Sequence, residues 1–173
     1  MTDAIDEGPR ILGTLRSIDG GGVVRIEDTV DAEVAQVWSA LTDPARLADW
    51  LGDVTGDLRA GGTYRGLFRV SGWDGEGRIE TCEAQRRLVV VEHQMDDPRE
   101  SVTEIELRAE DGRTRLVVQQ TGLPLEHVAA YGAGLQVHVE DLVAHVTGRT
   151  ERATPARWNE LHPGYLDQTV APR

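Results

Sequence analysis

Between residues 22 and 123 the chain repeatedly alternates apolar and polar residues, which is typical of strands with one buried face. In the first such stretch Val24, Ile26 and Val30 fall on one side, and Arg25 and Glu27 fall on the other. The remaining runs cover 64–70, 77–83, 88–93, 102–108 and 114–120, with 53–58 as a weaker candidate. This pattern predicts about seven strands joined mostly by short turns, which favours an antiparallel sheet.

Helical spacing occurs in three places. Residues 31–41 form one short amphipathic stretch, and 43–50 form a second in which Pro44 suits the first turn of a helix. The spacing over 128–148 is again helical, and Gly148 ends it as glycine commonly does. The chain is therefore predicted to be α+β, with a curved antiparallel sheet whose concave face is covered by one long C-terminal helix.

The chain has 173 residues, which suits one domain, and its composition shifts only at the two ends. Residues 1–21 finish in a glycine run and are interpreted as an N-terminal extension. Residues 22–148 form the predicted domain, and 149–173 form a C-terminal tail.

The tail contains three large apolar residues at helical spacing, Trp158, Leu161 and Tyr165. We expect them to pack on the body of the domain or on a second subunit. Pro163 and Gly164 follow closely, and proline is unfavourable inside a helix, so any helix here is expected to stop before them.

Charge excludes several classes of partner. With 18 basic and 30 acidic residues the net charge is −12, and such an acidic surface repels phosphate backbones and anionic lipids. Neither nucleic acid nor a membrane surface is therefore expected as a partner. All basic residues are arginines, because the sequence contains no lysine, and this excludes Schiff-base chemistry and a P-loop lysine.

The cysteine content and the first residues bear on the cellular location. Cys82 is the single cysteine, so an internal disulfide is impossible. The first residues are acidic where a signal peptide would be basic, which favours a cytoplasmic protein.

Several short blocks, together with the order of elements, carry a family resemblance. They are Val37 to Pro44, Leu47 to Trp50, Asp57 to Gly62, Arg86 to Leu88, Thr114 to Leu116 and Tyr131 to Gly134. The chain resembles the START-like or SRPBCC superfamily, also called the helix-grip or polyketide cyclase/lipid-transport fold. The branch it resembles most is named after the activator of the heat-shock protein 90 ATPase. The resemblance covers about residues 22–148 and implies a helix-grip fold, but function only loosely, because one scaffold hosts many functions.

The resemblance also implies a cavity between the sheet and the long helix. We expect its walls to include seven residues that are interpreted as ligand-binding: Trp50, Tyr64, Phe68, Trp73, Tyr131, Leu135 and His138. Ordinary core packing is the alternative interpretation for Trp50, Tyr64 and Phe68. At Leu135 the chain departs from the branch, whose members usually have tryptophan there. The smaller side chain should enlarge or reshape the cavity, unless a neighbour such as Trp73 fills the space.

Polar residues on predicted buried faces are a further set of candidates. Glu92 and Gln120 continue the faces of Val90 and Val118, and an inward polar group needs a partner or a ligand. Fraying at the strand ends, where His93 also lies, is the alternative interpretation.

The long helix carries His138, Asp141 and His145 along one side, as a metal or acid–base cluster would. They lie away from the centre of the apolar stripe, however, which favours hydrogen bonding at the boundary with solvent. No familiar catalytic motif is present, and Cys82 is interpreted as core filler. We therefore assign no catalytic residue, no metal ligand and no cofactor.

Three hypotheses for the function follow. The first is binding of a small hydrophobic or aromatic molecule in the cavity without chemistry, with a homodimer left open. The second is a polyketide cyclase or aromatase-like enzyme, in which Tyr64 and His138 face one void, orient a polyketone and move protons. The third is a chaperone ATPase activator, which acts through surface contacts and needs no cavity.

Overall fold

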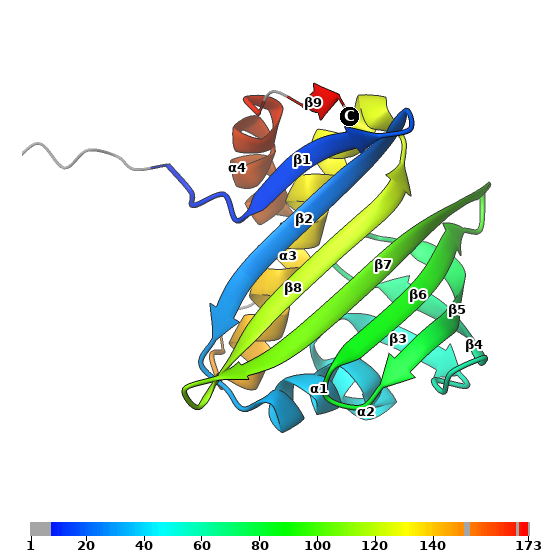
Figure 1. The fold of residues 1–173 in the computed structure, drawn as a ribbon, viewed down its shortest axis with the longest axis vertical. Helices are drawn as coiled ribbons and strands as arrows, with labels where there is room; N and C mark the ends of the chain where they lie inside the picture. Colours follow the sequence, from blue (N-terminus) through cyan, green and yellow to red (C-terminus); the bar gives the residue numbers. More distant parts are fainter. Residues whose placement is uncertain (1–7, 151–152, 169, 173) are drawn as a thin grey trace, which may run out of the picture.

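The computed structural model describes residues 8–150, 153–168 and 170–172. In these residues one sheet of nine strands has the order β3-β4-β5-β6-β7-β8-β2-β1-β9, and all neighbours are antiparallel except β1 and β9 (Figure 1). The strands are β1 (Gly13–Ile18), β2 (Gly21–Val30), β3 (Gly52–Gly56), β4 (Thr63–Phe68), β5 (Asp74–Glu83), β6 (Arg87–Gln94), β7 (Asp97–Glu110), β8 (Arg113–Leu123) and β9 (Ala171–Pro172). The helices are α1 (Val34–Thr42), α2 (Pro44–Trp50), the 3-10 turn η1 (Leu125–His127), α3 (Val128–Val146) and α4 (Pro155–Leu166).

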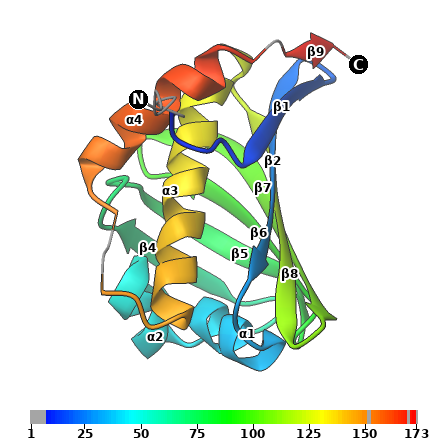
Figure 2. The ribbon, with the colours of Figure 1, turned by 90° about the vertical axis from the view of Figure 1, so that its left-hand side faces the viewer.

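Helix α3 runs across the concave face of the sheet, and α1 and α2 lie across one end of the hollow (Figure 2). Helix α3 packs most extensively against α4, and among the strands it packs chiefly against β2 and β1. Its buried residues Val128, Ala133 and Val137 join the core. The predicted α+β fold, a curved antiparallel sheet with a long C-terminal helix, is confirmed. No helix in the described part of the chain is both long and apolar enough to cross a membrane.

The sheet is wider than the predicted seven strands, because both ends of the chain contribute to it. Strand β1 lies within the residues interpreted as an N-terminal extension, and β9 lies in the tail. Asp19 and Gly20 have φ values of 50° and 80°, which is the backbone of a tight hairpin turn between β1 and β2. The start of the glycine run is therefore a turn within the sheet, whereas residues 1–7 lie outside the described residues.

Helix α4 continues to Leu166, so the expectation that a helix would stop before Pro163 is wrong. Tyr165, two residues beyond the proline, is completely buried and holds this last turn against the body. Gly164 permits this close packing, because a Cβ atom there would lie 2.6 Å from Cδ1 of Ile11. The tertiary contacts of the last turn thus outweigh the lost backbone hydrogen bond at the proline.

One buried side chain, Gln136 of α3, joins the two ends of the chain to the helix. Its Oε1 accepts hydrogen bonds from the backbone N–H of Leu12 at 3.0 Å and from the hydroxyl of Tyr165 at 2.7 Å. Its Nε2 donates to the carbonyl of Arg10 at 2.8 Å and to Glu140 at 3.0 Å. Because both polar atoms are satisfied, this buried amide stabilises α3 against β1 and α4.

The hydroxyl of Tyr165 also accepts from the N–H of Gly13 at 3.1 Å, so Tyr165→Phe should leave a buried donor without a partner. We expect the free energy of unfolding to fall by about 1 to 3 kcal/mol, measured by urea denaturation. Tyr131→Phe, at a partly exposed ring, is the matched control and should change stability little. Equal stability of Tyr165→Phe and the wild type would contradict this account.

Candidate functional site

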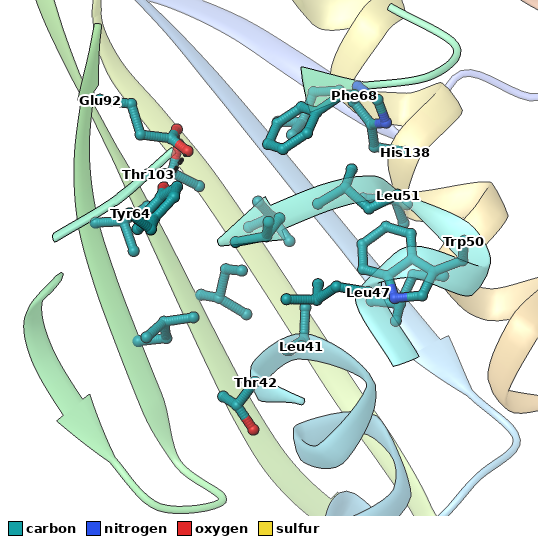
Figure 3. A pocket seen from close by; sticks show the side chains of 18 of the residues that line it. Leu41, Thr42, Leu47, Trp50, Leu51, Tyr64, Phe68, Glu92, Thr103 and His138 are labelled. Atoms are coloured by element: carbon teal, nitrogen blue, oxygen red, sulfur yellow. Dashed lines mark hydrogen bonds between the residues drawn. The ribbon is translucent and has the colours of Figure 1, made fainter. Parts of the chain in front are cut away.

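Two adjoining cavities lie between the sheet and α3, and we call them the inner and the outer chamber. The inner chamber has a volume of about 160 Å³ and the outer chamber about 540 Å³. Both are lined by the same five residues at the place where they meet, which we call the junction: Phe68, Glu92, Gln120, Leu135 and His138. Figure 3 shows the inner chamber, with Glu92, Thr103 and Tyr64 on one side and Phe68 and His138 on another.

The wall of the inner chamber is almost entirely apolar. It is formed by inward side chains of the sheet, by α1 and α2 and by α3, among them Leu41, Trp50, Ile79, Val90, Val118 and Leu142. The indole N–H of Trp50 donates to the carbonyl of Ala40 at 2.9 Å. Trp50 is thus a core residue whose polar atom is satisfied elsewhere, which leaves its apolar ring to line the chamber.

Aromatic side chains line the outer chamber. Phe68 and Trp73 stack with their ring centroids 4.6 Å apart, and Tyr131 and Trp158 contribute further rings. The indole N–H of Trp158 donates to the carbonyl of Ala130 at 3.1 Å, which fixes α4 beside α3 at this wall. The outer chamber is thus a hollow with several flat apolar faces.

Three inward glycines of the sheet make room for these rings. A Cβ at Gly75 would lie 2.5 Å from the ring of Trp73, and one at Gly66 would lie 2.9 Å from the same ring. A Cβ at Gly77 would overlap the ring of Tyr64. The aromatic rings therefore lie flat against bare backbone, and this places Tyr64 and Trp73 at the cavity walls.

A chain of hydrogen bonds ends on the carboxyl group of Glu92. The hydroxyl of Tyr64 donates to Oε1 of Glu92 at 2.5 Å, and the hydroxyl of Thr103 donates to Oε2 at 3.3 Å. Gln120 donates from Nε2 to the hydroxyl of Thr103 at 3.1 Å. Strands β4, β6, β7 and β8 thus bring four polar groups to one point of an otherwise apolar surface.

Burial shifts the proton affinity of this cluster. It raises the pKa of Glu92 above the usual 4.5, against the effect of the hydrogen bonds from Tyr64 and Thr103, which lower it. Burial and the neighbouring carboxyl also raise the pKa of Tyr64 well above its ordinary value, so this hydroxyl keeps its proton. The junction therefore holds a carboxyl group that is costly to ionise as it stands.

His138 lies across the junction on α3. Its ring meets Phe68 edge to face, with centroids 5.6 Å apart, and its Nδ1 atom is buried with no hydrogen-bond partner in the described residues. Burial lowers its pKa from 6.5 to about 4, so the imidazole is neutral at physiological pH. An unpaired buried nitrogen at a cavity wall is a group that a ligand can satisfy.

All seven residues expected at the cavity lie in the walls of the two chambers. Trp50 and Tyr64 line the inner chamber, Trp73 and Tyr131 line the outer one, and Phe68, Leu135 and His138 line both. That they bind a ligand stays a prediction.

The inward polar candidates also have definite places. Glu92 and Gln120 lie inside β6 and β8 and not at frayed ends, since these strands continue to Gln94 and Leu123. Thr103 was missed, because a threonine in an alternating strand carries no distinctive pattern. Trp158 was expected to pack on the body, but nothing in the sequence indicated that it forms a cavity wall.

The other two members of the predicted helix cluster lie elsewhere. Asp141 accepts a hydrogen bond from the N–H of Ala153 at 2.6 Å, and His145 lies 3.3 Å from the guanidinium of Arg46. Neither residue lines the chambers, so the spacing of the three residues does not create a joint site. Within the described ranges, no group of three His, Cys, Asp or Glu side chains is placed to hold a metal ion.

The lowered pKa of His138 predicts a pH dependence of stability. The unfolded chain takes up this proton near pH 6.5 and the folded chain only near pH 4, so stability is complete above about pH 6.5 and falls towards pH 4. The loss attributable to His138 should be on the order of 2 to 3 kcal/mol. Urea denaturation over this range should show a shallower loss in His138→Phe, and identical pH profiles would contradict the assignment.

The comparisons with known proteins agree with this geometry. CalU16 from Micromonospora echinospora has 26% sequence identity and a TM-score of 0.69, over 89% of this chain and 93% of that chain. DynU16, a protein in the dynemicin biosynthetic locus, has 28% identity and a TM-score of 0.68, over 76% of this chain and 49% of that chain. The protein EF2215 from Enterococcus faecalis shares the fold at 17% identity, with a TM-score of 0.68 over 90% of this chain and 88% of that chain.

None of the curated proteins matches the sequence. A family does: residues 31–147 match the family described as Activator of Hsp90 ATPase homolog 1-like protein. The matched region begins just after β2 and ends just after α3, so it contains every residue that lines the inner chamber. Since it is also more than half of the chain, the protein belongs to the Activator of Hsp90 ATPase homolog 1-like family and has the START-like fold of that superfamily.

Proposed function

We propose that this protein binds a small hydrophobic or aromatic molecule in the two chambers, without chemistry of its own. The observation that carries the proposal is that an apolar inner chamber and an aromatic outer chamber meet at one junction. The outer volume of about 540 Å³ falls within the range of roughly 300 to 1,000 Å³ that is usual for ligand pockets. The inner volume of about 160 Å³ is close to that of an apolar cavity that holds benzene, roughly 150 Å³.

These sizes suggest how a ligand lies. One ring or a short branched chain occupies the inner chamber, and the larger part of the molecule lies against Phe68, Trp73 and Tyr131 in the outer chamber. Apolar burial then supplies most of the binding energy, at about 25 cal/mol per Å² removed from water. DynU16 belongs to a biosynthetic locus, which is in keeping with a small molecule as the ligand.

Leu135 offers a direct test, because it lines both chambers and stands where relatives in the branch usually have tryptophan. Leu135→Trp should fill the junction and weaken binding of the neutral fluorescent probe N-phenyl-1-naphthylamine by about tenfold or more. If the junction is hollow, the melting temperature should stay equal or rise, whereas a solid core would lose about 1 to 3 kcal/mol through overpacking.

Leu135→Met is the matched control, because it conserves volume and should keep both stability and probe binding. The same samples should be examined by native mass spectrometry, which reports a co-purified ligand and any homodimer together. A wild-type protein that binds no probe, combined with a destabilised Leu135→Trp, would contradict the proposed function.

One observation favours a second candidate, an enzyme of the polyketide cyclase or aromatase type. Tyr64 and His138 both line the inner chamber, as that hypothesis requires, and His138 is neutral and so able to accept a proton. Such an enzyme would consume a linear poly-β-ketone probe, followed by absorbance, and lose this activity in Tyr64→Phe and His138→Phe. Binding without turnover favours the first candidate. A chaperone-activating role acts through surface contacts and gains no support from the chambers.

A further inference from the structure

The two chambers have no basic residue in their lining, although the protein contains 18 arginines. Among the described residues that line them, Glu92 alone carries a formal charge when ionised, and no arginine is present. A ligand that enters either chamber therefore meets one acidic group and no basic group.

The carboxyl group of Glu92 has its hydrogen-bond donors but no counter-charge. Tyr64 and Thr103 each donate to one of its oxygens, and such donors favour the ionised form. No arginine is among the groups that act on it, so burial outweighs these donors and raises its pKa. What the ionised carboxylate lacks is a cation.

The groups that face Glu92 within the two chambers are uncharged. They are Tyr64 of β4, Gly77 of β5, Ser101 and Thr103 of β7, Gln120 of β8 and, across the junction, His138 of α3. His138 stays neutral at pH 7, because burial lowers its pKa to about 4. Charged groups do line a smaller recess of about 30 Å³ that Glu92 also borders, namely His93, Asp97 and Arg99. Arg99 is paired there with Asp97 at 2.7 Å, and it is not among the groups that shift the pKa of Glu92.

The aromatic walls add a second attraction for positive charge. Phe68, Trp73, Tyr131 and Trp158 present rings to the outer chamber, and ring faces attract organic cations. The net charge of −12 also raises the local concentration of cations at the surface.

We propose that the ligand is an organic cation, an amine or quaternary ammonium group on an apolar body, whose positive group lies beside Glu92 at the junction. The apolar body fills the inner chamber, and the ammonium group supplies the counter-charge that the carboxylate lacks. This inference rests on the proposed function, because it names the chemical class of the molecule that the chambers bind.

The test compares two probes of equal shape. One is (2-naphthylmethyl)trimethylammonium, and the other is its neutral carbon isostere 2-neopentylnaphthalene, with dissociation constants measured by the quenching of naphthalene fluorescence at pH 7.5. The cation should bind at least about tenfold more tightly than the isostere. Equal affinities, or tighter binding of the isostere, would overturn the inference while leaving hydrophobic binding intact, and no binding of either probe would overturn both proposals.

Glu92→Gln keeps the shape of the side chain but removes the charge, so it should remove most of the preference for the cation and leave the affinity for the isostere within about twofold. The matched control is Glu106→Gln, at an exposed position of β7, which should keep the full preference. If Glu92→Gln also keeps the full preference, the aromatic walls are its source and the role of Glu92 is overturned.

Measuring the affinity of both probes for the wild-type protein as a function of pH gives a second test that needs no variant. The quaternary ammonium group does not titrate, so its affinity for the wild-type protein should rise with pH as Glu92 ionises, and this rise should occur above the ordinary carboxyl pKa of 4.5. The neutral isostere should show no such rise. A flat profile for the cation would contradict the inference.

Discussion

The hollow exists because α3 rests on one half of a curved sheet. Among the strands, the helix packs chiefly against β2 and β1, whereas inward residues of β4, β5 and β6 line the inner chamber. Gln136 holds the helix there, since its amide is bonded to Leu12, Arg10 and the hydroxyl of Tyr165. Without these contacts α3 would be free to settle towards β4 to β6 and close the space, because packed interiors leave few voids.

The same arrangement explains why an acidic group is tolerated at the junction. Buried polar groups are unfavourable unless paired, and Glu92 obtains two donors only because β4 and β7 lie on either side of the pair of strands β5 and β6. Even so, its pKa is raised, which means that its ionised form reduces the stability of the empty protein. A valine here would be the more stable choice for a core, so the cost points to a use of the carboxyl group in binding.

The sequence was informative where a pattern depends on burial. Alternation predicted the central strands and helical spacing predicted α3, because one face of each meets the core. It failed at β1, whose buried positions Gly13, Leu15 and Ser17 include only one large apolar residue, and at β9, which has only two residues. It also failed at Pro163, where the burial of Tyr165 overrides a local rule. The wall residues Tyr64 and Phe68 were predictable from one strand face, whereas the cavity position of Trp158 was not. The partners of Glu92 depend on strand order and register, which no local pattern encodes.

The region that matches the family contains only part of the residues that line the two chambers. The matched region, residues 31–147, includes Glu92 and the aromatic residues of β4 and α3. Pro155, Trp158 and Asn159 of α4 lie outside it, yet they line the outer chamber. Leu135 lies inside the match and lines both chambers, as do the other residues of the junction. The family match therefore covers the whole lining of the inner chamber and the junction, whereas the outer chamber is completed by a helix of the tail, because α4 packs beside α3 at that wall.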